Sequence, residues 1–141
     1  DKDLTIRTSI IGPQIGNGSG LFHWFMHQND SVNGFTSAFW SGVTTIELAR
    51  IIDKAITQNI SGLIIVTGKG KIDKYSLLNL FNKIFRNNEI IINPKSDYKV
   101  DKSMYSSRTD FDYTPLEYEQ MIVEMKDWIT SNSDKYIYNK S

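Results

Sequence analysis

The chain has 141 residues, of which 40% are hydrophobic and 23% charged, so it is long enough for one hydrophobic core and too apolar to be disordered. Its 16 basic and 16 acidic residues cancel, which leaves no net charge to attract nucleic acid. It has no cysteine, which excludes disulfides, thiolate catalysis and cysteine-based zinc sites and is typical of a reducing compartment, so we expect a cytoplasmic protein.

The first third of the chain predicts a strand, a loop and a short helix. Residues 4–11 are rich in β-branched side chains with alternating apolar positions, which predicts a strand that ends at Gly12 and Pro13. Three glycines within residues 14–20 predict a flexible loop. The aromatic run 21–26 then predicts a short helix.

The middle of the chain alternates between helix and strand. Thr44 or Thr45 can cap a helix whose apolar residues recur at helical spacing, and the all-apolar run 63–66 predicts a strand buried on both faces of a parallel sheet. Asp73 is expected to cap a second helix, followed by a strand over 89–93. This order predicts right-handed crossovers, parallel pairing and an α/β fold.

The last part of the chain is predicted to contain one helix, preceded by an irregular segment. We expect Pro94 to end the strand before it, and residues 95–113 show little periodicity. Thr114 and Glu117 have the spacing of a capping box, with Pro115 at the first helical position. The helix is expected to bury five residues, which are Tyr118, Met121, Ile122, Met125 and Ile129.

The two histidines, His23 and His27, stand four residues apart on one helix face, where they could bind zinc. The metalloprotease pattern requires a glutamate directly after the first histidine, and Trp24 stands there instead. We therefore expect no metal, with His23 lining or packing against a pocket and His27 in solvent.

Two Tyr-x-x-x-Lys pairs, Tyr98/Lys102 and Tyr136/Lys140, would matter in a reductase, because a lysine can lower the phenol pKa for proton transfer. Neither pair follows a glycine-rich cofactor turn. The glycine-rich stretch 12–20 lacks both the GxGxxG spacing and the ending of a phosphate-binding loop, and so does 68–71. We expect no catalytic residue here, and both stretches are typical of turns, although the first can also move when a ligand binds.

A cluster of aromatic residues between positions 22 and 40 is either core or the wall of a ligand pocket. Trp40, between strand-like and helical segments, is the strongest candidate for the wall. Lys102 and Arg108 lie in the irregular segment, where they could hold a diphosphate or remain solvated surface charges.

Five blocks of the sequence follow one another in a characteristic order. They are Ile6-Arg-Thr-Ser-Ile-Ile-Gly-Pro13; Gly20-Leu-Phe-His-Trp-Phe25; Phe39-Trp-Ser-Gly-Val-Thr-Thr-Ile-Glu-Leu-Ala49; Gly62-Leu-Ile-Ile-Val-Thr67 with Ile72-Asp-Lys-Tyr-Ser-Leu-Leu78; and Val100-Asp-Lys-Ser-Met104 through Pro115-Leu-Glu-Tyr-Glu-Gln-Met-Ile122. In this order they resemble the extended short-chain dehydrogenases/reductases related to dTDP-4-dehydrorhamnose reductase, in the NAD-dependent epimerase/dehydratase superfamily. The resemblance covers Leu4 to about Ile129.

The resemblance implies that the chain is the C-terminal portion of an extended Rossmann-type reductase. Residues 1–13 would be the last strand of the Rossmann sheet, 14–130 a small α/β substrate-binding domain, and 131–141 a flexible tail.

The resemblance also assigns roles to individual residues. Those matching Thr8 and Ser9 lie near the nicotinamide of the cofactor, and those matching Leu21 and Phe22 meet the sugar nucleotide. Basic residues near Lys102 and Arg108 help to hold the diphosphate, and no residue of this chain is expected to be catalytic.

These roles describe the substrate-binding portion of an NAD(P)-dependent reductase that reduces a 4-keto sugar nucleotide for bacterial surface polysaccharide. An epimerase of the same superfamily and a non-catalytic module that binds a sugar nucleotide or a protein are the alternatives. The family's glycine-rich turn and catalytic Tyr-x-x-x-Lys belong upstream of Asp1. NAD(P) is therefore expected in the full-length enzyme, and neither cofactor nor reductase activity for this chain alone.

The expected partner is a nucleotide-activated sugar. No apolar stretch approaches the roughly 18–20 residues of a membrane-spanning helix, so no membrane partner is expected. The balanced charge gives no affinity for nucleic acid, so no nucleic-acid partner is expected either. An edge strand over 4–11 without its sheet partners would be prone to association, which leaves a homo-oligomer open.

Overall fold

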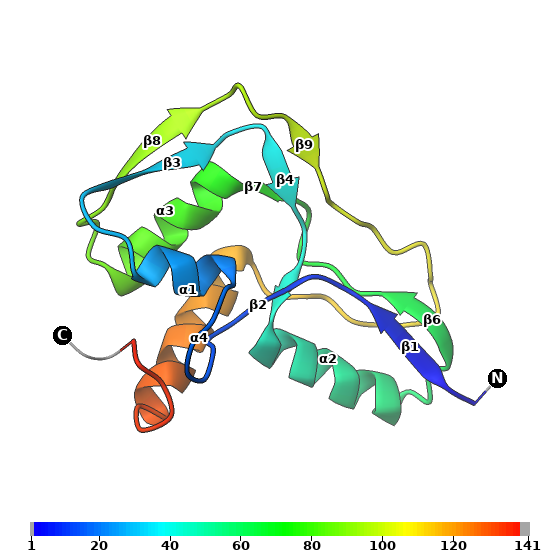
Figure 1. The fold of residues 1–141 in the computed structure, drawn as a ribbon. Helices are drawn as coiled ribbons and strands as arrows, with labels where there is room; N and C mark the ends of the chain where they lie inside the picture. Colours follow the sequence, from blue (N-terminus) through cyan, green and yellow to red (C-terminus); the bar gives the residue numbers. More distant parts are fainter. Residues whose placement is uncertain (1, 139–141) are drawn as a thin grey trace.

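A computed structural model describes residues 2–138, which contain four helices and nine short strands (Figure 1). The strands are β1 (Leu4–Arg7), β2 (Ile10–Ile11), β3 (Ser31–Phe35), β4 (Ala38–Trp40), β5 (Val43–Thr44), β6 (Gly62–Ile65), β7 (Ile72–Asp73), β8 (Ile91–Lys95) and β9 (Val100–Asp101). The helices are α1 (Leu21–Met26), α2 (Thr45–Thr57), α3 (Lys74–Phe85) and α4 (Tyr118–Ser131). The α/β fold predicted from the alternating pattern is confirmed. None of these helices is both long enough and apolar enough to span a membrane.

Small sheets connect segments that are far apart in the sequence. β1 pairs in parallel with β6, β2 with β5, and β3 with β8. β4 lies between β7, which is antiparallel to it, and β9, which is parallel. The parallel pairing predicted between the strands near 63–66 and 89–93 was wrong, because β6 pairs in parallel with β1 and β8 pairs in parallel with β3, and the two do not pair with each other.

The strand predicted over 4–11 is divided into β1 and β2. At the break, the Thr8 hydroxyl donates to the carbonyl oxygen of Val66 at 2.9 Å, and the Ser9 carbonyl accepts from the Val43 N–H at 2.9 Å. The chain therefore leaves β6 at Thr8 and joins β5 after Ser9, and this change of partner ends the first strand.

Two predictions about the later strands were wrong. Leu63 is 54% exposed while Ile64 is 1% exposed, because the two-stranded β1–β6 sheet packs on α2 through one face only. Pro94 lies within β8, opposite Gly34 of β3, and does not end the strand. Proline is tolerated there because β8 is an edge strand, so the missing N–H interrupts no second ladder.

Helix starts were predicted correctly where a capping side chain precedes a clear apolar repeat. The Thr44 hydroxyl accepts from the Glu47 N–H at 3.2 Å, and the Asp73 carboxylate accepts from the Ser76 N–H at 2.8 Å. The capping box predicted from Thr114 was wrong, because Glu117 caps α4 with Gln120 as its partner. The preceding segment, with Phe111, Tyr113 and Leu116, packs against the core instead of joining the helix. The five residues predicted to be buried in α4 are all buried.

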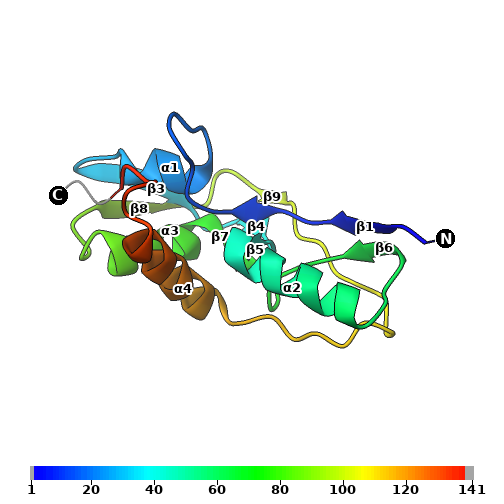
Figure 2. The ribbon, with the colours of Figure 1, turned by 90° about the horizontal axis from the view of Figure 1, so that it is seen from below.

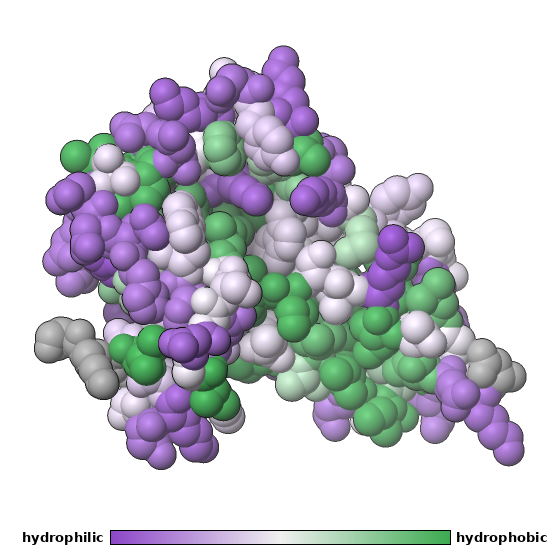
Figure 3. All heavy atoms as spheres, viewed as in Figure 1, coloured by the Kyte–Doolittle hydropathy of each residue, from purple (hydrophilic) through white to green (hydrophobic). Residues whose placement is uncertain are grey.

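The hydrophobic interior has two parts that correspond to two lobes (Figures 1 and 2). One cluster joins α1, α3, α4 and β3 around Phe22, Phe25 and Phe81, and the other joins α2, β5, β6 and α4. Trp40 packs against both clusters. On the face shown in Figure 3, hydrophobic residues gather over the β1–β6 and α2 lobe, whereas hydrophilic residues predominate over β3 and β8.

Candidate functional site

A pocket of about 240 Å³, named here the tryptophan pocket, lies where β2, α1, β4, α3 and β9 meet. Its lining residues are Ile10, Ile11, Leu21, Phe39, Trp40, Lys74, Leu77, Val100 and Lys102. Three of the five predicted substrate residues, Leu21, Trp40 and Lys102, are thus brought together. The pocket combines an apolar and aromatic wall with two lysines, which suits a ligand with both a flat or apolar part and negative charge.

The pairing around β4 explains why these residues meet. Phe39 lies opposite Asp73 of β7 on one side and opposite Asp101 of β9 on the other. Asp73 caps α3, so Lys74 follows at the first helical position, while the Lys102 N–H donates to the Phe39 carbonyl at 3.1 Å. The two lysines therefore reach the pocket from opposite sides of the aromatic strand.

A third lysine near the pocket is already neutralised. Lys71 forms an ion pair with Asp101 at 2.8 Å, and its ammonium lies 4.2 Å from the centre of the Phe39 ring. The hydrogen bonds from Lys71 and Ser103 hold the pKa of Asp101 well below its usual range, so the Asp101 carboxylate stays ionised at neutral pH. Among residues 2–138, neither Lys74 nor Lys102 has such an acidic partner, and both remain able to attract an anion.

A second pocket of about 240 Å³, named here the loop pocket, adjoins the first, because both are lined by Ile10, Ile11 and Leu21. It is completed by Gly12, Pro13, Gln14, Gly20, Phe22 and Thr45. Phe22 is only 1% exposed and packs mainly into the core, so Leu21 offers the larger contact. The glycine-rich stretch thus forms the edge of a pocket, and its movement with a ligand stays a prediction.

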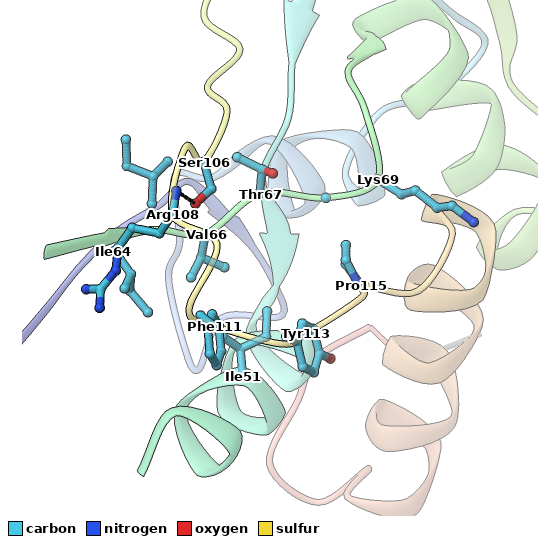
Figure 4. Close-up of a pocket in the computed structure, with 12 residues that line it drawn as sticks. Ile51, Ile64, Val66, Thr67, Lys69, Ser106, Arg108, Phe111, Tyr113 and Pro115 are labelled. Atoms are coloured by element: carbon cyan, nitrogen blue, oxygen red, sulfur yellow. Dashed lines mark hydrogen bonds between the residues drawn. The ribbon is translucent and has the colours of Figure 1, made fainter. Parts of the chain in front are cut away.

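Arg108 lies apart from both pockets, at one end of a third pocket of about 210 Å³ (Figure 4). Its guanidinium donates to the carbonyl oxygens of Ser61 at 2.6 Å and Leu63 at 3.2 Å, and it forms an ion pair with Asp110. The hydrogen bonds from Arg108 lower the pKa of Asp110. The Nη1 group of Arg108 therefore fastens the 102–117 segment to the start of β6, while its Nε and Nη2 groups bond to Asp110 within that segment. The predicted diphosphate contact of Arg108 stays a prediction.

The remaining predicted residues lie close to the pockets without lining them. Thr8 and Ser9 occupy the junction between β1 and β2, where their hydrogen bonds to Val66 and Val43 fix the backbone. His23 points to Tyr138, with 2.7 Å between its Nδ1 and the phenol oxygen, and His27 is exposed. No group of three or more metal-ligating side chains occurs within residues 2–138.

Lys74 was not predicted as a site residue, because a lysine in the first turn of a helix is usually a solvated charge. The available signal was its position directly after the Asp73 cap, within the block Ile72-Asp-Lys-Tyr-Ser-Leu-Leu78. Only the pairing of β7 with β4 brings that position to the tryptophan pocket.

A buried acidic residue connects the elements below the pockets. Glu47 is fully buried in α2, where it accepts from the Tyr113 hydroxyl and pairs with Arg50, which also pairs with Glu124 of α4. Burial raises the pKa of Glu47, and the nearby Arg50 charge opposes this. Among residues 2–138, Glu47 lines none of the three pockets, so its role is to connect α2, α4 and the 102–117 segment.

The fold has clear counterparts among solved structures, although no protein-family model and no curated protein matches the sequence. A dTDP-4-dehydrorhamnose reductase from Bacillus anthracis, in complex with NADP, has a TM-score of 0.75 at 14% identity over 91% of this chain and 49% of its own. The reductase from Clostridium acetobutylicum has a TM-score of 0.71 at 16% identity over 90% and 49%. The chain has the fold of part of these reductases.

The likeness extends to other sugar-nucleotide enzymes. A UDP-N-acetylglucosamine 4-epimerase from Methanobrevibacter ruminantium, in complex with UDP-N-acetylmuramic acid, has a TM-score of 0.64 at 13% identity over 92% of this chain and 46% of its own. The chain thus spans about half the length of these enzymes. The predicted resemblance to a portion of an extended reductase is confirmed at the level of the fold.

Proposed function

We propose that the chain is the substrate-binding part of an NAD(P)-dependent sugar-nucleotide reductase that reduces a 4-keto sugar for bacterial surface polysaccharide. The observation that carries the proposal is the tryptophan pocket, where Leu21 and Trp40 lie beside Lys74 and Lys102. An aromatic wall suits a base or sugar ring, and two lysines without acidic partners suit a diphosphate. A nucleotide-activated sugar contains both parts.

The residues of this chain do not fit the dinucleotide cofactor. The glycine-rich stretch between β2 and α1 lacks the GxGxxG spacing, and α1 has only six residues with Gly20 as its N-cap. Hydride transfer would therefore need the remainder of a longer enzyme to hold NAD(P). In that enzyme, Thr8 and Ser9 are proposed to lie near the nicotinamide.

The β1–β6 sheet supports such an arrangement. Among residues 2–138 it has two strands, and Leu63 of β6 and Ile10 of β2 are both more than half exposed. We propose that this sheet continues into the Rossmann sheet of the longer enzyme, with residues 14–130 as the substrate-binding domain. Of the predicted tail 131–141, residues 139–141 lie outside the described part of the chain. Arg108 lines a different pocket from Lys74 and Lys102, so its predicted contact with the diphosphate stays a prediction.

An epimerase of the same superfamily is the second candidate, since the solved structures with this fold include sugar-nucleotide 4-epimerases. The tryptophan pocket would serve either reaction equally. The group that holds and transfers the hydride distinguishes them, and it would lie in the other part of the enzyme.

The purified chain is expected to bind dTDP-glucose or UDP-glucose more tightly than it binds thymidine or uridine. The reason is that the nucleosides lack the diphosphate that Lys74 and Lys102 would attract. Isothermal titration calorimetry measures the dissociation constants, and quenching of tryptophan fluorescence, to which Trp40 contributes with Trp24 and Trp128, provides a second signal. If a range of dTDP and UDP sugars all fail to bind, the pocket has another role and the proposal is wrong.

Replacing Lys102 with alanine is expected to weaken binding of the same sugar nucleotides about tenfold, since a charge-assisted contact to phosphate is lost. Binding of the nucleoside should change little. Lys99→Ala is the matched control, because Lys99 is an exposed lysine in the same segment that lines neither pocket. Equal losses of affinity in the two variants would show that Lys102 acts only through the overall charge.

A further inference from the structure

After α4 the chain turns back toward α1, so that the last described residues lie beside the glycine-rich loop (Figure 2). Tyr138 is partly buried there, with its ring centre 5.1 Å from that of Phe22 and 5.6 Å from that of His23. Both of these neighbours belong to α1. The tail thus packs against the helix that forms one wall of the loop pocket.

The Tyr138 phenol makes two hydrogen bonds to segments on either side of the loop. Its oxygen accepts from the Gln14 N–H at 3.0 Å and lies 2.7 Å from the Nδ1 of His23. The donor in this second contact is set by the tautomer of His23, so either Nδ1 donates to the phenol oxygen or the phenol donates its proton to Nδ1. Burial raises the pKa of Tyr138, so the phenol keeps this proton at neutral pH.

These two contacts hold the start and the end of the loop. Gln14 begins the loop, and its side-chain oxygen accepts from the Gly20 N–H at 3.4 Å. The loop folds so closely over Gln14 that a Cβ added at Gly18 would lie 1.5 Å from the same oxygen. Gln14, Gly20 and Leu21 all line the loop pocket, whereas residues 15–17 are exposed.

The tail is in turn anchored to α4. The Tyr136 ring stacks against that of Tyr138 at 6.5 Å, and its hydroxyl accepts from the Trp128 Nε1–H at 3.0 Å. A continuous set of contacts therefore runs from α4 through the tail to the loop and α1.

We propose that Tyr138 is a positioning residue for the sugar-nucleotide site, which fixes the glycine-rich loop and the start of α1 so that Leu21 faces the ligand. The proposal rests on the proposed function, because it concerns the same ligand. Tyr138 lines neither the tryptophan pocket nor the loop pocket, so it acts through Gln14 and His23.

The test compares Tyr138→Phe with Tyr136→Phe in the purified chain. Each variant removes one hydroxyl and its hydrogen bonding from the same tail, but only Tyr138 bonds to the loop and α1. For Tyr138→Phe the affinity for dTDP-glucose or UDP-glucose is expected to fall about fivefold, as for the loss of one hydrogen bond. For Tyr136→Phe it should change less than about twofold, with similar small decreases in melting temperature for both.

Hydrogen exchange provides a readout that a general loss of stability would not reproduce. Amides of residues 14–20 should exchange faster in Tyr138→Phe than in Tyr136→Phe, while amides of α2 exchange alike in both. Equal affinities in the wild type and Tyr138→Phe would overturn the role of Tyr138 and leave the proposed function intact. Failure of the wild type to bind any sugar nucleotide would overturn the proposed function and this role together.

Discussion

Replacing Phe81 with alanine is expected to lower the free energy of unfolding by about 3–5 kcal/mol, the largest effect of any single change considered. Phe81 lies in α3 with no exposed surface, and its ring centre is 5.4 Å from that of Phe22 and 5.9 Å from that of Phe25. Removing the ring would leave a cavity between α1 and α3 that close-packed neighbours cannot fill. Urea denaturation followed by circular dichroism measures the loss.

Tyr105→Ala is the control for this prediction. Tyr105 is also aromatic but 81% exposed, so its removal should change the unfolding free energy by less than about 0.5 kcal/mol. If Phe81→Ala were no more destabilising than Tyr105→Ala, the packing of α1 against α3 would not contribute to stability as described.

Replacing Glu47 with alanine is expected to lower the unfolding free energy by about 2–3 kcal/mol. The change removes the acceptor of the Tyr113 hydroxyl and one of the two carboxylates that hold Arg50. Arg50 keeps its ion pair with Glu124 and is partly exposed, so the expected loss of unfolding free energy is smaller than for a variant that leaves a fully buried charge without a partner. Glu119→Ala removes a comparable but exposed pair with Lys83 and should cost less than about 1 kcal/mol.

The pH dependence of the unfolding free energy separates the contribution of the Glu47 charge from that of its hydrogen bonds. The pKa of Glu47 is raised above 4.5 in the folded chain, so the folded state holds this proton more tightly than the unfolded state does. The resulting stabilisation is fully present below pH 4.5 and is lost as the pH rises through the raised value. Glu47→Gln, which does not titrate, should therefore become more stable relative to the wild type over that window. An unchanged difference between the two would show that Glu47 titrates normally.

Sequence reasoning located the helices well because their signals are local. Thr44 and Asp73 are capping residues placed directly before apolar repeats, and both caps form. β3 was missed because its residues, Ser-Val-Asn-Gly-Phe, contain few strand formers and become a strand only through pairing with β8. The start of α4 was misplaced because the preceding aromatic residues pack under α2, a tertiary contact that the capping pattern does not reveal.

The candidate site was predictable in its chemistry and less so in its geometry. An aromatic residue and basic residues in irregular segments were recognised, and Leu21, Trp40 and Lys102 do line one pocket. Lys74 was missed and Arg108 lies elsewhere, because both positions depend on which strands pair with β4 and β6. Whether the predicted residues bind substrate stays a prediction that the titrations address.

The strand pairings described above also bear on how the chain reaches its native state. Within residues 2–138, no sheet pairs two strands that are consecutive in the sequence, and the Thr8–Val66 contact at the end of the β1–β6 pair closes a loop of 58 residues. Such long loops must close before any sheet gains its hydrogen bonds, and a high contact order of this kind slows folding. We therefore expect the helices to form before β1 pairs with β6, and we expect these two strands to be the segments most exposed to misassociation during folding.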